Sequence, residues 1–136
     1  MSCPPPIQSF AAYQEAVKRT YQDRYQTRYG EMPGIVVHGF GIAGEAGEVA
    51  ELLKKCLSRG GELDIAKLRE ELGDVIWYAT AIALDTGLTL EEIVAAQVEK
   101  GLRRHPNGFT PESSIARVDQ VQTCSCGAPI PCGTVR

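Results

Sequence analysis

The chain has 136 residues, of which 43% are hydrophobic and 23% are charged, proportions that indicate a globular protein long enough for one domain. Its net charge of −3 gives no general attraction to nucleic acid or to an anionic membrane, because both require a positive surface. No apolar run is long enough to span a bilayer, and the first residues lack the pattern of a signal peptide. We therefore expect a cytoplasmic protein with neither a membrane nor a nucleic acid as partner.

The first half of the chain predicts two helices. Ser9 is a suitable N-cap for a helix that runs to about residue 28, and the glycines and proline that begin at Gly30 indicate a loop. The second helix carries a continuous apolar stripe and stops at Gly60-Gly61. The residues of this stripe are Ile42, Ala46, Val49, Ala50, Leu53, Cys56 and Leu57.

Two further helices are predicted in the second half. Asp64 can cap the third helix, which Gly87 ends. Thr89 and Glu92 have the spacing of a capping box at the start of the fourth helix. That helix should end near His105, because the residue before a proline disfavours helical geometry.

Residues 9–108 are therefore expected to form one all-α domain of four helices, since no segment shows the alternation of a strand. Residues 109–136 are expected to form an irregular tail, because Pro, Gly, Ser and Thr dominate there. The tail cysteines allow a structural Zn²⁺ site with Cys3 or His105, but unligated thiols are favoured, since such sites more often use a CxxC pair. The tail cysteines are Cys124, Cys126 and Cys132.

Two pairs of acidic residues lie beside the apolar stripes of the second and third helices. Glu45 and Glu48 are three residues apart on the second helix, and Glu71 and Asp74 are three apart on the third. Because helical residues turn by about 100° each, both pairs face one another if the two stripes pack together. The spacing alone leaves Glu70 open as an alternative to Glu71.

Convergent carboxylates require a cation, and ligation by oxygen alone favours Mg²⁺, or Mn²⁺, over zinc. A divalent ion at such a site assists the attack of water on phosphorus. Lys55 and Tyr78 lie on the same two strips, and Lys55 adds a positive contact. The alternative is an ordinary solvated helix surface, in which the acidic residues only pair with nearby lysines.

Two motifs resemble those of the MazG-like, all-α nucleoside triphosphate pyrophosphohydrolases, especially the short phage and bacterial type. They are GIAGEAGEVAE at residues 41–51 and ELGDVIWY at residues 71–78. The resemblance covers about residues 9 to 108. It implies that a (deoxy)nucleoside triphosphate is cleaved between its α and β phosphates, and that two or four identical chains complete the helical bundle. It also implies magnesium ligands at Glu45, Glu48, Glu71 and Asp74, with Glu71 preferred over Glu70.

The resemblance further implies contacts with the substrate. Lys55, Lys100 and either Arg103 or Arg104 would hold phosphates, and Gln14, Trp77 or Tyr78 would touch the base or the sugar. The family often has Asn-x-x-Lys in the last helix, where this chain has Gln97 before Lys100. The phage type favours a purine such as dGTP or GTP; dCTP or dUTP is the alternative nucleotide, and a non-catalytic oligomeric interaction module is the alternative class.

Two other features are interpreted as structural. His38 is placed in the loop before the second helix, where incidental exposure is favoured over contact with the substrate. Tyr21, Tyr25 and Tyr29 alternate with arginines in a pattern that also suits binding of single-stranded nucleic acid. Their i+4 spacing and the negative net charge favour packing along the first helix.

Overall fold

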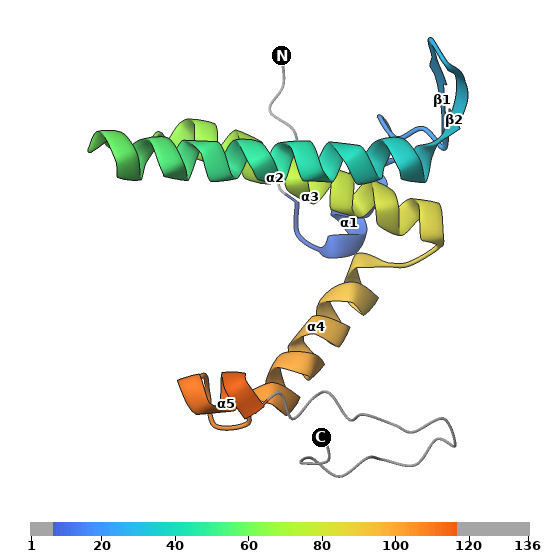
Figure 1. Cartoon of the computed structure of the whole chain (residues 1–136). Coiled ribbons are helices and arrows are strands. Elements are labelled where there is room, and N and C mark those ends of the chain that lie inside the picture. Colours follow the sequence, from blue (N-terminus) through green and yellow to red (C-terminus); the bar gives the residue numbers. More distant parts are fainter. Residues whose placement is uncertain (1–6, 117–136) are drawn as a thin grey trace, which may run out of the picture. The chain divides into compact units, whose positions relative to one another are not determined.

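The computed structural model of the protein describes residues 7–116 (Figure 1). Five helices and one small two-stranded sheet in these residues confirm the all-α fold class. No described helix is long and apolar enough to cross a membrane. The elements in chain order are α1 (Phe10–Val17), β1 (Arg24–Thr27), β2 (Gly30–Pro33), α2 (Gly34–Arg59), α3 (Ile65–Thr86), α4 (Leu90–Arg104) and α5 (Pro111–Ala116).

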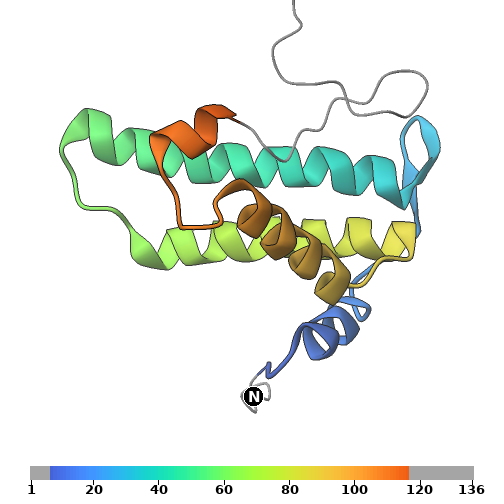
Figure 2. The ribbon, with the colours of Figure 1, turned by 90° about the horizontal axis from the view of Figure 1, so that it is seen from below.

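The described residues belong to two compact units, one ending at Glu92 and the other beginning at Ile93. At the centre of the first unit, α2 and α3 lie side by side and run in opposite directions (Figures 1 and 2). Helix α2 ends where Gly60 adopts a left-handed backbone conformation with φ of 64°, which a glycine accepts without strain. Asp64 then caps α3 by accepting a hydrogen bond from the N–H of Lys67. The helix end at Gly60 and the cap at Asp64 were both predicted, and the turn between them lets α3 run back along α2.

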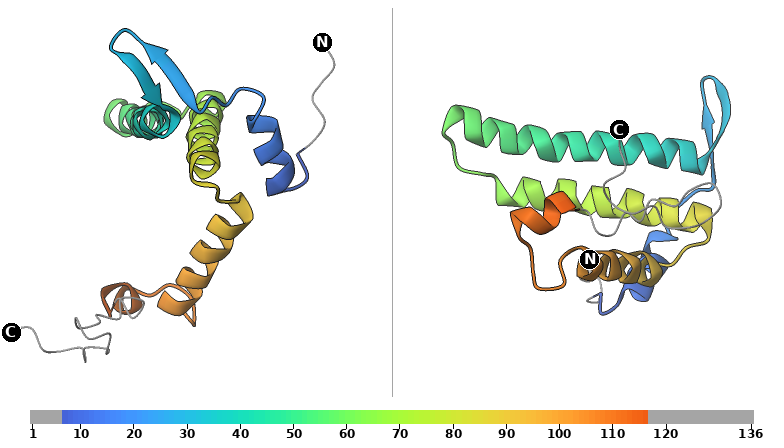
Figure 3. Two further views of the ribbon diagram at one scale, coloured as in Figure 1. Left: turned by 90° about the vertical axis from the view of Figure 1, so that its right-hand side faces the viewer. Right: turned by 60° about the horizontal axis from the view of Figure 1, so that its bottom comes forward.

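The N-terminal helix is shorter than predicted, and a β-hairpin follows it. Ser9 caps α1 as expected, but the helix ends at Val17 rather than near residue 28. Strands β1 and β2 pair antiparallel, with Thr27 opposite Gly30, and the hairpin lies at the N-terminal end of α2, while α1 packs on α3 (Figure 3). The predicted continuous helix and the predicted absence of strands were therefore wrong.

Local and tertiary causes both explain the hairpin. Tyrosines and threonines favour extended backbone, and Gly30 has a φ of 106° at the end of the two-residue turn. Tyr21 and Tyr25 direct their hydroxyl groups to Asp85 and His38, contacts that connect this segment to both long helices. Their predicted packing along one helix was thus also wrong.

The contact between α2 and α3 differs from a purely apolar seam. The predicted stripe residues Leu53 and Leu57 remain 42% and 86% exposed, and Leu72 and Ile76 on α3 are exposed as well. The helical period identifies apolar faces but does not tell which of two neighbouring faces meets the partner helix. Residue pairs that meet across the seam include His38 with Asp85, Gly41 with Tyr78, and Glu45 with Glu71.

The start of α4 follows the prediction. The backbone N–H of Thr89 donates to the Glu92 carboxylate at 2.8 Å, and the N–H of Glu92 donates to the Thr89 hydroxyl at 3.2 Å, which is a capping box. Helix α4 ends at Arg104, next to His105. Residues 111–116 form α5, although an irregular tail was expected there.

Candidate active site

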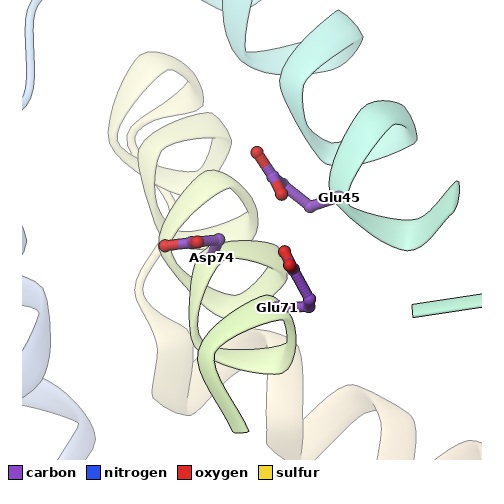
Figure 4. Close-up of side chains that lie close together, drawn as sticks. All are labelled: Glu45, Glu71 and Asp74. Carbon is purple, nitrogen blue, oxygen red and sulfur yellow. The ribbon is translucent and has the colours of Figure 1, made fainter. Parts of the chain in front are cut away.

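Three of the four predicted carboxylates converge between α2 and α3. Glu45 on α2 and Glu71 and Asp74 on α3 each offer a carboxylate oxygen, and these oxygens all lie within 4.8 Å of one another (Figure 4). Glu71 is almost fully buried, with 3% of its surface exposed. Glu48 is exposed on α2 and lies outside this group.

The electrostatics of this acidic cluster, defined as Glu45, Glu71 and Asp74, favour a bound cation. Desolvation raises the pKa of Glu45 above its ordinary value, and the charge of Asp74, a hydrogen bond with Glu71 and the charge of Glu48 raise it further. Each of these causes disfavours the ionised carboxylate. A positive ion among the three groups would reverse that balance.

Among the described residues, Lys67, which the sequence interpretation missed, forms an ion pair with a member of the acidic cluster. Its Nζ lies 2.7 Å from Oε1 of Glu71 and 3.3 Å from Oε2 of Glu70. Hydrogen bonds to these two carboxylates, that to Glu71 first, raise the pKa of Lys67 above its ordinary value. The i,i+4 spacing to Glu71 was the available signal. Glu70 is exposed, so the structure places Glu71, and not its neighbour, in the cluster.

Lys55 forms an ion pair outside the acidic cluster. Its Nζ lies 3.6 Å from Oε1 of Glu51, one turn earlier on α2, and Lys54 forms an ion pair with the same residue. The hydrogen bond from Lys54 is the main cause that lowers the pKa of Glu51. Lys55, which was expected to lie on one strip with Glu45, therefore pairs with Glu51 and not with the acidic cluster.

An aromatic pair lies on the turn of α3 that follows Asp74. Trp77 and Tyr78 meet edge to face, with ring centroids 5.0 Å apart, a favoured geometry for aromatic rings. The indole N–H of Trp77 donates to the hydroxyl of Thr20 at 3.0 Å. Tyr78 packs so tightly on Gly41 that a Cβ there would lie 2.2 Å from the tyrosine ring. Both rings are therefore held in place by the surrounding fold.

His38 lies inside α2, and its predicted position in a loop was wrong. It is completely buried. Its Nδ1 is 2.7 Å from Oδ2 of Asp85, and its Nε2 is 3.0 Å from the hydroxyl of Tyr25. Tyr21 donates to the other Asp85 oxygen at 2.8 Å, and burial with this hydrogen bond raises the pKa of Tyr21 to about 12. This buried network ties the hairpin segment to both long helices and leaves His38 no exposed surface for a substrate.

Gln14, which was expected to contact the base or sugar, has its side-chain amide hydrogen-bonded to the backbone. Its amide nitrogen donates to the carbonyl of Leu88 at 3.0 Å, and its amide oxygen accepts from the N–H of Leu90 at 3.1 Å. Both ends of this buried amide therefore connect α1 to the start of α4.

The remaining predicted phosphate contacts belong to the second unit. In α4, Lys100 is exposed, Arg103 forms an ion pair with Glu99 at 2.8 Å, and Arg104 is partly buried. The predicted zinc cysteines Cys124, Cys126 and Cys132, and Cys3 with them, lie outside the described residues.

The donor set of the acidic cluster fits a hard divalent ion. Its ligand atoms are all carboxylate oxygens, which suit Mg²⁺ and Mn²⁺ rather than softer metals. One member is buried and two approach from the same helix, so the group is held by the helix pair itself. Such a site can bind phosphate oxygens through the ion.

The comparisons with known proteins agree with this geometry. The family model of the MazG nucleotide pyrophosphohydrolase domain matches residues 40–109, just over half of the chain. The matched segment includes all three members of the acidic cluster and Glu48. Neither the curated proteins nor the solved structures that were compared gave a match.

Proposed function

The chain belongs to the MazG nucleotide pyrophosphohydrolase family, and from this premise we propose that it hydrolyses a (deoxy)nucleoside triphosphate to the monophosphate and pyrophosphate with Mg²⁺ as its cofactor. The observation that carries the proposal is the convergence of Glu45, Glu71 and Asp74 within 4.8 Å, inside the segment that the family model matches. Membership of this enzyme family argues against the alternative of a non-catalytic interaction module.

The acidic cluster would hold the metal, with Glu48 as a fourth carboxylate at its exposed side. A divalent ion there supplies charge neutralisation for the phosphates and acidification of a water nucleophile. Glu71 is fixed by burial and by Lys67, and Glu45 would contribute a second carboxylate from the facing helix. The protein's contribution is thus mainly to position charge before the substrate arrives.

Further substrate contacts are proposed from the aromatic pair on α3 and from the resemblance of the two sequence motifs to the family. Trp77 and Tyr78 lie on the turn of α3 after Asp74 and offer aromatic surface to a base or sugar. From the resemblance, Lys55, Lys100 and either Arg103 or Arg104 are proposed as the phosphate contacts. We place dGTP or GTP first among substrates because of the similarity to the phage type, with dCTP or dUTP as the alternative.

We also propose that a second copy of the chain, or three further copies, completes the helical bundle. The support is the exposed apolar surface of the long helices, where Phe40 is 76% exposed. Apolar area of this kind is stabilised when a partner covers it. Leu53, Leu57, Ile65, Leu72 and Ile76 on the same two helices are exposed as well.

A nucleotide panel tests the proposed reaction. Each of the (deoxy)nucleoside triphosphates is incubated with the full chain, with and without Mg²⁺, and both pyrophosphate and monophosphate are measured. We expect equal amounts of the two products from one preferred nucleotide, and no turnover when the metal is chelated. Release of orthophosphate, or turnover without a divalent ion, would contradict the proposal.

A pair of neighbouring variants ties the reaction to the acidic cluster. Glu71→Gln removes a buried ligand and should lower kcat by about a hundredfold or more, whereas Glu70→Gln removes the exposed neighbour and should leave turnover within about twofold. Circular dichroism shows whether both variants are folded. Equal turnover in the two variants would show that the acidic cluster does not take part in the reaction.

A further inference from the structure

Lys67 contacts the acidic cluster from the first turn of α3. Its Nζ is 2.7 Å from Oε1 of Glu71, whose side chain is only 4% exposed. The Lys67 side chain itself is 48% exposed. Among the ion pairs of the described residues, this one alone reaches Glu45, Glu71 or Asp74.

A buried carboxylate without a positive partner is costly, because burial removes the water that would stabilise its charge. Lys67 supplies that partner to Glu71. A divalent ion bound by the same carboxylate would supply it as well, and it would also repel the ammonium group a few ångströms away. The two cations therefore compete for one set of negative charges.

The Lys67 ammonium group can also leave Glu71 at little cost. Its stem is half exposed, and its second contact is the exposed Glu70 at 3.3 Å. Leaving Glu71 would take the ammonium group into water or fully onto Glu70, neither of which is expensive for a lysine. The contact with Glu71 is thus one that a bound metal ion can replace.

We propose that Lys67 is an internal counter-ion of the metal site, which holds Glu71 in place in the metal-free protein and is displaced when the divalent ion binds. This role rests on the proposed function, because it assumes that the acidic cluster is a metal site. It makes Lys67 a positioning residue that sets the metal concentration at which the enzyme is loaded.

The test is metal affinity rather than turnover. Mg²⁺ and Mn²⁺ are titrated into the full chain and into Lys67→Gln by calorimetry, and thermal unfolding is followed with and without the ion. We expect Lys67→Gln to bind either ion about three- to tenfold more tightly, the effect of removing one half-exposed charge near a divalent ion. Its metal-free form should unfold at a lower temperature, and its stabilisation by metal should exceed that of the unchanged chain.

Two control variants isolate the charge at this position. Lys67→Arg keeps the charge and should retain the original affinity. Lys54→Gln removes a lysine from α2 that pairs with Glu51, and it should leave the affinity unchanged. Weaker or unaltered binding in Lys67→Gln overturns the counter-ion role alone, whereas failure of the unchanged chain to bind either ion at millimolar concentration overturns the metal site itself.

Discussion

At the scale of single residues, the environment of Glu45 in the acidic cluster lowers the stability of the metal-free fold at neutral pH. Desolvation and the neighbouring carboxylates raise its pKa above the ordinary value of 4.5. The folded, metal-free chain therefore binds a proton at Glu45 more readily than the unfolded chain does. The sign of the linkage follows: Glu45 favours folding most below pH 4.5, and this contribution is lost as the pH rises through the raised pKa.

Glu45→Gln is consequently expected to stabilise the metal-free protein while abolishing function. At about pH 8 its melting temperature should exceed that of the unchanged chain, and at about pH 4 the two should converge. With saturating Mg²⁺ the order should reverse, since only the unchanged chain keeps its full ligand set. Turnover should fall by about a hundredfold or more.

Differential scanning fluorimetry at several pH values, with and without metal, measures all of these effects. Glu62→Gln is the matched control, because Glu62 is an exposed carboxylate in the turn between α2 and α3. Its melting temperature should follow that of the unchanged chain at every pH. A Glu45→Gln protein that is less stable than the original at about pH 8 without metal would refute the assigned repulsion.

At the scale of elements, the close approach of α2 and α3 depends on Gly41. A methyl group there would lie 2.2 Å from the Tyr78 ring, a separation that forces the ring or the helix to move. Gly41→Ala should lower the free energy of unfolding by about 1–3 kcal/mol through overpacking, even though alanine favours a helix by about 1 kcal/mol relative to glycine. Because Tyr78 follows Asp74 on the same helix, turnover should fall as well.

Gly39→Ala on the same helix is the control. Beyond its own helix backbone, no atom of the described residues lies within 4 Å of the position that its Cβ would take. The helix preference alone should therefore act and raise the free energy of unfolding by up to about 1 kcal/mol. Denaturant titration of both variants gives the comparison. Equal stability changes of the two would show that Tyr78 does not restrict α2.

The same two helices show what the sequence predicts and what it does not. Gly60, Asp64 and the Thr89–Glu92 box are local signals, and each ends or begins a helix where it was expected. The acidic pairs were placed on the correct helices because ExxE and ExxD spacing is also local. His38 was placed in a loop because Gly30, Pro33 and Gly34 precede it, whereas α2 already begins at Gly34. Its contact with Asp85, 47 residues away in the chain, is one that no helical period encodes.

The hairpin and the seam were missed for the same reason. Tyr21 and Tyr25 at i+4 spacing suit a helix as well as two separate contacts, and only the position of α3 decides between them. Lys67 likewise had the spacing of an ordinary surface pair with Glu71. Its significance depends on the burial of Glu71, which follows from the packing of α2 on α3.

At the scale of the whole molecule, the apolar surface of the long helices predicts self-association. Leu53 and Leu57, on the C-terminal half of α2, are 42% and 86% exposed in the described chain. Burying a leucine contributes about 1.5–3 kcal/mol, so replacing both with glutamate should weaken assembly by about a hundredfold or more. Light scattering coupled to size exclusion should show a dimer or tetramer for the unchanged chain and a smaller species for Leu53→Glu/Leu57→Glu.

Turnover at low protein concentration distinguishes an assembly that serves the reaction from one that only covers apolar surface. If a second copy completes the substrate groove, specific activity should fall on dilution, and it should fall at higher concentrations in the double variant than in the unchanged chain. Tyr29→Ser removes an 82% exposed aromatic side chain at the hairpin turn and should alter neither mass nor activity. A fully active monomer would instead mean that one chain alone supplies the groove, and that α2 and α3 tolerate their exposed leucines.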